Sequence, residues 1–246
     1  MHSVNFEKIN GKDVFVVFSE PEPSQKKLVI MSHGFRGSSV GPARTFVDFE
    51  RILLKNGFSV LRFDQPNSGN SEGDYIDSSF NEWVDTTTYF ANKYLDVGYQ
   101  VALLGQSMGA STTVVASARQ ELKGKIRCLL LWVPDPKTTF NKPADETYEE
   151  GGQKYKGTFW QEAKDSDFFD CLNQFDGAIH LVYGENDKYI SEELRGKVIK
   201  AVKDKNQEVM VLPGQDHSPW EFDIAQEVYE EELKILQECF IQKEQN

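Results

Sequence analysis

The feature that most constrains this chain is the segment over residues 100–109, QVALLGQSMG. Its first half is an apolar run of the kind found in strands of a parallel sheet covered on both faces. The run continues directly into Gly105-Gln106-Ser107-Met108-Gly109 and then into small residues that favour a helix. This order predicts a strand, a sharp turn at Ser107 and a helix.

The predicted turn has chemical consequences. A serine on so sharp a strand-to-helix turn has a strained backbone, and the flanking glycines are needed because a Cβ would strike the neighbouring strand or helix. The helix start behind Ser107 offers unpaired amide N–H groups, which stabilise negative charge on a substrate oxygen. We therefore predict a nucleophile elbow. On the motif alone, a glycine-rich turn that only tightens helix packing stays open.

Strand and helix patterns alternate along the rest of the chain. We expect strands over 4–9, 14–18, 28–31, 58–63, 100–106, 126–133, 179–183 and 208–212, and helices over 42–55, 80–95, 110–122, 191–202 and 220–241. We expect the first two strands to form an antiparallel hairpin at one edge of the sheet. Parallel strands joined by helices predict an α/β fold with a doubly wound, mostly parallel sheet.

The length of 246 residues suits a single domain over 1–246. The alternation of strands and helices ends after position 133. Prolines, acidic residues and glycines follow there, without regularly spaced apolar residues. We interpret residues 134–169 as a short cap insertion over the carboxyl edge of the sheet. Its aromatic residues, Trp160 above all, are candidate walls of a substrate pocket, with packing inside the cap as the alternative.

Composition excludes several function classes. A net charge of −12 makes nucleic acid and anionic membrane surfaces unsuitable partners. No basic segment followed by an apolar one opens the chain, and its longest wholly apolar run is far too short for a membrane span. The three cysteines, at positions 128, 171 and 239, suit reduced thiols better than disulfides or a zinc site. We expect a soluble, cytoplasmic protein.

Three loops after predicted strands carry the residue types of a Ser-His-Asp triad. In a parallel α/β sheet the carboxyl ends of the strands converge on one crevice. Ser107, Asp187 and His217 follow three such strands, in the chain order that the α/β-hydrolase fold requires. Asp187 could instead be a turn or N-cap residue. Asp135, after the strand over 126–133, is the rival acid.

Backbone amides complete the predicted site. His33-Gly34-Phe35 follows an early strand, so the Phe35 N–H can act as an oxyanion donor beside that of Met108. With this set, Ser107 is the nucleophile, His217 the base and Asp187 the group that orients the imidazole. No metal or cofactor is needed for such chemistry.

The motifs together resemble those of a known family. HGF at 33–35, RFDQPNSGNSEG at 62–73, GQSMG at 105–109, GENDKYI at 184–190 and DHSPW at 216–220 are similar to motifs of α/β-hydrolase superfamily serine hydrolases. The compact size and single cap resemble bacterial cinnamoyl and feruloyl esterases, although 65–68 departs from their usual loop. The resemblance implies a carboxylesterase acting on a small-molecule ester and is compatible with a homodimer. A thioesterase, a peptidase or a non-catalytic binding protein of the same fold are the alternatives.

Overall fold

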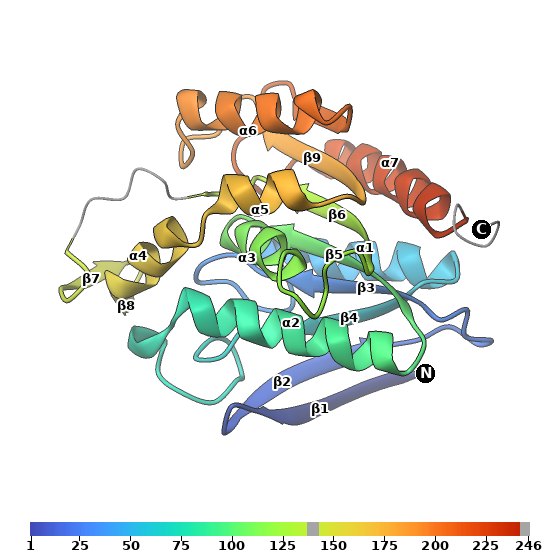
Figure 1. The fold of residues 1–246 in the computed structure, drawn as a ribbon, viewed down its shortest axis with the longest axis horizontal. Helices are drawn as coiled ribbons and strands as arrows, with labels where there is room; N and C mark the ends of the chain where they lie inside the picture. Colours follow the sequence, from blue (N-terminus) through green and yellow to red (C-terminus); the bar gives the residue numbers. More distant parts are fainter. Residues whose placement is uncertain (137–142, 242–246) are drawn as a thin grey trace.

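The computed structural model describes residues 1–136 and 143–241 and contains an eight-stranded sheet at its centre. The strand order is β1-β2-β4-β3-β5-β6-β9-β10 (Figure 1). β1 pairs antiparallel with β2 and β2 antiparallel with β4, whereas all the other pairings are parallel. The strands are β1 (His2–Ile9), β2 (Lys12–Ser19), β3 (Lys27–Ser32), β4 (Ser59–Phe63), β5 (Gln100–Gln106), β6 (Ile126–Trp132), β9 (Ala178–Gly184) and β10 (Glu208–Leu212). The predicted α/β class with a mostly parallel sheet is confirmed.

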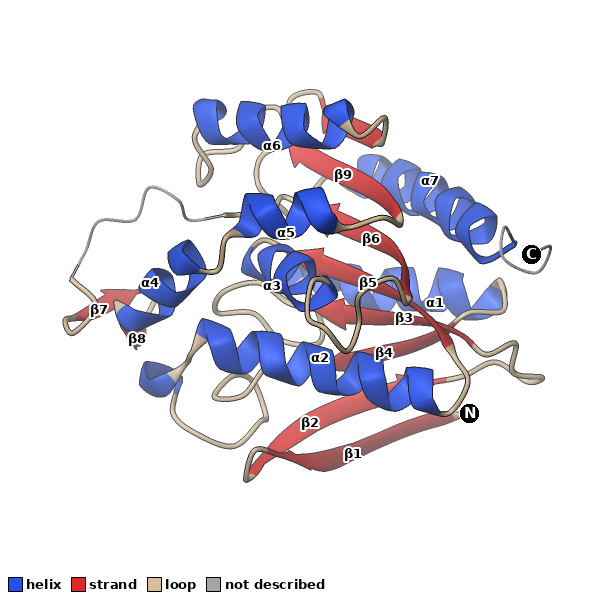
Figure 2. Cartoon of the chain, viewed as in Figure 1, coloured by secondary structure: helices blue, strands red, loops and turns tan. Residues whose placement is uncertain are grey.

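Helices cover both faces of this sheet (Figure 2). On one face α1 (Thr45–Lys55) contacts α7 (Phe222–Ile241), which also packs on β6 and β9. On the other face α2 (Phe80–Asp96) contacts α3 (Met108–Ser117), and α5 (Phe168–Gln174) lies between α3 and α6 (Glu192–Asp204). The central strands β3, β5 and β6 are therefore covered on both faces, which explains why their sequences are continuous apolar runs.

Two helices differ from the sequence expectation by three residues or more at one end. The expected helix over 42–55 begins as a three-residue 3₁₀ turn, Pro42–Arg44, because Ala43 and Arg44 have left-handed φ values of 46° and 68°. The regular helix starts only at Thr45. The helix expected over 110–122 starts two residues earlier and ends at Ser117, where bonds from Ala118 and Arg119 back to the third preceding carbonyl close it.

The predicted cap contains structure of its own. A hairpin of β7 (Thr147–Glu150) and β8 (Gln153–Lys156) is followed by α4 (Thr158–Asp165). Figure 1 shows these elements beyond the carboxyl ends of the central strands. Residues 137–142 of the expected insertion lie outside the described residues.

A helix that crosses a bilayer needs both a length of about 20 residues and a largely apolar sequence. None of the helices in the two described ranges meets both conditions.

Candidate active site

Ser107 lies on the sharp turn that the sequence predicts. It stands between the last residue of β5 and the first of α3, with φ 54° and ψ −121°. A Cβ on Gly105 would lie 2.4 Å from the Ala110 Cα, and one on Gly109 would lie 2.1 Å from the Ser32 carbonyl oxygen. Both flanking positions therefore require glycine, because strand, turn and helix approach one another too closely for a side chain.

The structure brings Ser107, His217 and Asp187 into one hydrogen-bonded chain. His217 Nε2 is 3.0 Å from Ser107 Oγ, and His217 Nδ1 is 2.7 Å from Asp187 Oδ2. Asp187 Oδ1 accepts hydrogen bonds from the backbone N–H groups of Tyr189 and Ile190, at 2.8 and 3.0 Å. With both oxygens engaged and no side-chain exposure, the carboxylate has a fixed orientation toward the imidazole.

The two other aspartates near His217 are placed differently. Asp216 accepts the backbone N–H of His217 at 2.8 Å and forms an ion pair with Lys188 at 2.9 Å. The Lys188 ammonium, then the backbone N–H groups of His217 and Lys188, lower the pKa of Asp216 to about 2. Asp135 is buried and lines the same cavity as Ser107. The imidazole Nδ1 of His217 therefore meets Asp187, whereas Asp216 holds the backbone of the histidine loop.

The turn after β3 fixes the orientation of the Phe35 N–H. The Gly34 carbonyl belongs to the same peptide plane, so whatever holds this carbonyl also sets the direction of that N–H. Gly34 O accepts from His33 Nδ1 at 2.8 Å and from the Gly37 N–H at 2.9 Å. His33 Nε2 accepts the Gln65 N–H at 2.9 Å, and burial lowers the pKa of His33. A neutral imidazole with its proton on Nδ1 satisfies both contacts.

The two predicted oxyanion donors lie in the turn after β3 and at the start of α3. Met108 is the first residue of α3, and amides in the first turn of a helix have no intrahelical acceptor. Among the described residues, the Phe35 N–H has no protein acceptor either. Both residues line the cavity that holds Ser107.

This cavity has a volume of about 240 Å³ and lies between the sheet and the cap. Besides the residues named above, its walls include Arg36, Gln106, Glu150, Trp160, Tyr189 and Ser218. The Trp160 ring lies 4.4 Å from that of Phe35, centroid to centroid, and only 5% of the residue is exposed. Trp160 therefore belongs to a packed aromatic cluster and to the cavity wall at once. Arg36 and Glu150 join the turn to the cap by an ion pair of 2.9 Å.

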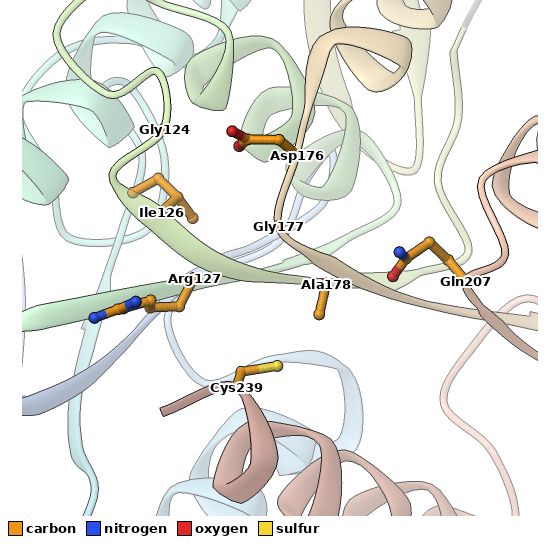
Figure 3. A pocket seen from close by; sticks show the side chains of 8 residues that line it. All are labelled: Gly124, Ile126, Arg127, Asp176, Gly177, Ala178, Gln207 and Cys239. Atoms are coloured by element: carbon orange, nitrogen blue, oxygen red, sulfur yellow. The ribbon is translucent and has the colours of Figure 1, made fainter. Parts of the chain in front are cut away.

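A second cavity lies at the opposite end of the sheet. Its volume is about 390 Å³, and Figure 3 shows Asp176, Gln207 and Cys239 among the side chains around it. None of the predicted site residues lines this cavity. The cavity that contains Ser107 is therefore the candidate active site, although it is smaller.

Sequence reasoning missed the residues that brace the site. Gln106, the variable second position of the G-x-S-x-G motif, accepts the Gly34 N–H and donates to Ser218 Oγ. Tyr189 lies with its ring 5.1 Å from that of His217. The motif's variable position next to Ser107 was the available signal for Gln106. Ser218 and Tyr189 lie within the DHSPW and GENDKYI motifs, which gave no separate role to either residue.

Comparison with known proteins finds a family match over part of the chain and solved structures of similar fold. The family described as "Serine aminopeptidase, S33" matches residues 23–138, a range that includes Phe35, Ser107 and Met108. A comparison with curated proteins finds no match.

Three solved structures show the similarity of fold. Est1E from Butyrivibrio proteoclasticus, with bound ferulic acid, has 20% identity and a TM-score of 0.81 over 96% of this chain and 99% of its own. The α/β hydrolase GrgF from a Penicillium species has 15% identity and a TM-score of 0.80 over 97% and 99%. A monoacylglycerol lipase from Paleococcus ferrophilus has 17% identity and a TM-score of 0.73 over 92% and 99%.

The chain therefore has the fold of the α/β hydrolases, and over residues 23–138 it is similar to a family of serine hydrolases. In fold it is similar to two structures of Est1E, one of which has ferulic acid bound.

Proposed function

We propose that the protein is a carboxylesterase that cleaves small acyl or aryl esters through an acyl-enzyme on Ser107. The observation that carries this proposal is the continuous chain from Ser107 Oγ through His217 to Asp187, with contacts of 3.0 and 2.7 Å. A serine hydroxyl is a weak nucleophile at neutral pH, and such a chain supplies the base that activates it.

The steps follow from the positions of these groups. His217 Nε2 takes the proton of Ser107 as its oxygen attacks the ester carbonyl, and the Asp187 carboxylate stabilises the imidazolium that forms. The Phe35 and Met108 N–H groups hold the oxyanion of the tetrahedral intermediate, an interaction worth about two to three powers of ten in rate per donor. His217 returns the proton to the leaving alcohol. Water then releases the acid by the same route.

The cavity wall supports a preference for aromatic acyl groups. Trp160 and Phe35 both face the cavity and pack against each other. A flat acyl group that stacks on such rings gains about 0.5–1.5 kcal/mol beyond the burial of its area. Est1E, similar in fold, binds ferulic acid, which is a hydroxycinnamic acid.

Trp160 offers a test of this preference. Trp160→Phe keeps an aromatic ring in the cluster, so that folding is maintained, and reduces the stacking surface. We expect the KM for a hydroxycinnamate ester to rise about two- to tenfold, with the KM for an acetate ester unchanged. Steady-state kinetics on both esters measure this. An equal rise for both would remove the support for an aromatic preference.

One observation favours a second candidate. The matching family is described as a serine aminopeptidase, and the same triad geometry can attack an amide. A panel of p-nitrophenyl esters, acyl thioesters and aminoacyl amides, matched in acyl group, separates the two. We expect the highest kcat/KM on the esters. A higher value on the amides would replace the esterase with a peptidase.

A fluorophosphonate probe tests the serine hydrolase chemistry itself. We expect stoichiometric labelling at Ser107, and no labelling would indicate a fold used for binding alone.

A further inference from the structure

Gln106 lies between two loops that reach the site from distant parts of the sequence. Its side-chain Oε1 accepts the N–H of Gly34 at 3.1 Å. Its Nε2 donates to the Oγ of Ser218 at 3.0 Å. Gly34 precedes the predicted oxyanion donor Phe35, and Ser218 follows the predicted base His217. One amide therefore joins the two loops directly beside Ser107.

The chemistry of this position suits an amide. A glutamine side chain accepts at its oxygen and donates at its nitrogen at the same time, so it satisfies a backbone N–H and a hydroxyl oxygen together. Gln106 is only 7% exposed, which means that water offers little substitute for either bond. A buried donor or acceptor that loses its partner costs about 1–3 kcal/mol, so both bonds strongly favour the bridged arrangement.

The contact with Gly34 completes the fixation of the oxyanion turn. The Gly34 carbonyl is held by His33 Nδ1 at 2.8 Å, and the Gly34 N–H is held by Gln106. A Cβ at position 34 would lie 2.5 Å from Gln106 Oε1. A side chain at position 34 would therefore displace the Gln106 amide from this contact. Both peptide planes of Gly34 are anchored, including the plane that carries the Phe35 N–H.

We propose that Gln106 is a positioning residue that holds the Phe35 oxyanion donor and the His217 base in register on either side of Ser107. The proposal rests on the esterase function proposed above. Gln106 touches no reacting atom in this role. It acts by keeping the donor and the base in the places where the tetrahedral intermediate needs them, so its loss reduces stabilisation of the transition state more than binding of the substrate.

Three variants test the bridge. Gln106→Met keeps the length of the side chain and removes both hydrogen bonds. Ser218→Ala removes only the partner on the histidine loop. Gln207→Met is the matched control, because Gln207 also accepts a backbone N–H, that of Ile179 at 2.7 Å, but lines the cavity at the opposite end of the sheet (Figure 3).

The expected results separate positioning from stability. Gln106→Met should lower kcat about 10- to 100-fold with KM within about threefold, somewhat less than the loss of a whole oxyanion donor. Ser218→Ala should lower kcat about three- to tenfold. The double variant should match Gln106→Met alone, since both changes break the same bridge. Gln207→Met should leave kcat unchanged, and the melting temperature of each variant is measured alongside.

The same variants are assayed by the rate of fluorophosphonate labelling, in which Ser107 attacks phosphorus and fluoride leaves. The transition state places negative charge on the phosphoryl oxygen, and the reaction needs no ester substrate. Labelling should slow by the same factors as kcat. If the wild type labels at Ser107 but cleaves no ester in the panel, the esterase proposal fails while the labelling rates still test Gln106.

Three results would overturn the role of Gln106. The first is a kcat and labelling rate of Gln106→Met within twofold of wild type. The second is a kcat loss in Gln207→Met equal to that in Gln106→Met, which would trace the effect to lost stability. The third is a rise in KM alone. If Gln106→Met does not fold, the test rests on Ser218→Ala alone. An unchanged kcat in Ser218→Ala then overturns the proposal.

Discussion

The described residues contain two buried histidine–carboxylate pairs, His217 with Asp187 and His180 with Glu232. The first has an Nδ1 to oxygen distance of 2.7 Å, and the second has one of 3.2 Å. His217 comes from a loop after the last strand, and 11% of its side chain is exposed where it faces Ser107. His180 lies within β9 and is 2% exposed, packed under α7. A histidine–carboxylate pair thus occurs both beside the cavity and in the core.

The environment of Glu232 shows what the second pair does. The Trp132 Nε1–H donates to Glu232 Oε1 at 2.6 Å, so the carboxyl joins α7 to β6 as well as to β9. Burial raises the pKa of Glu232, against the lowering effect of His180 and Trp132. A histidine beside a carboxylate is therefore insufficient for catalysis. The pair at His217 differs because His217 Nε2 faces Ser107, which lies on a strained turn, and both residues line a cavity.

The largest expected effect comes from removing that serine. Ser107→Ala should lower kcat by about six powers of ten, the usual loss for a triad nucleophile, and leave the fold intact. Ester hydrolysis by protein free of contaminating hydrolase measures this. Residual activity above about a hundredth of wild type would contradict the assignment.

Removing the charge of Asp187 should have the next largest effect. Asp187→Asn should lower kcat by about four powers of ten, because an amide favours the wrong tautomer of the imidazole. Asp135→Asn is the control within the same cavity and should cost far less. The reverse ranking in steady-state kinetics would move the acid to the loop after β6.

The equivalent change in the second pair should leave catalysis unaffected. Glu232→Gln keeps an oxygen that can accept from Trp132 and removes the buried charge. We expect kcat within about threefold of wild type, in contrast to Asp187→Asn. A loss of more than about a hundredfold, without unfolding by circular dichroism, would show that the two pairs are not separate in function.

The smallest effect concerns the pH dependence of stability. The pKa of Glu232 is raised above 4.5 in the folded protein, so the folded state keeps this proton to higher pH than the unfolded state. Its contribution to the free energy of unfolding is therefore full below about pH 4.5 and decreases as the pH rises through the folded pKa. Relative to wild type, Glu232→Gln should become more stable over that range. Urea unfolding at several pH values tests this, and a constant difference would contradict it.

The sequence predicted the fold well where one local pattern decided the structure. The apolar run of β5, the two glycines around Ser107 and the hairpin of β1 and β2 each follow from neighbouring residues. The start of α1 was misplaced because the left-handed backbone at Ala43 and Arg44 has no signal in their residue types.

Contacts between distant positions could not be predicted in the same way. The contacts of Gln106 with Gly34 and Ser218 join positions 72 and 112 residues apart, so no local pattern encodes them. The order of Ser107, Asp187 and His217 identified loops that meet, and the structure brings the three side chains together. Their catalytic roles stay a prediction.

The most direct test of the account is to trap the acyl-enzyme. The protein is mixed with a p-nitrophenyl ester, quenched in acid during turnover and analysed by peptide mass spectrometry. We expect an initial burst of p-nitrophenolate and the mass of the acyl group on the peptide that contains Ser107. Turnover without a covalent adduct, or an adduct on a different residue, would contradict the role of Ser107 as the nucleophile.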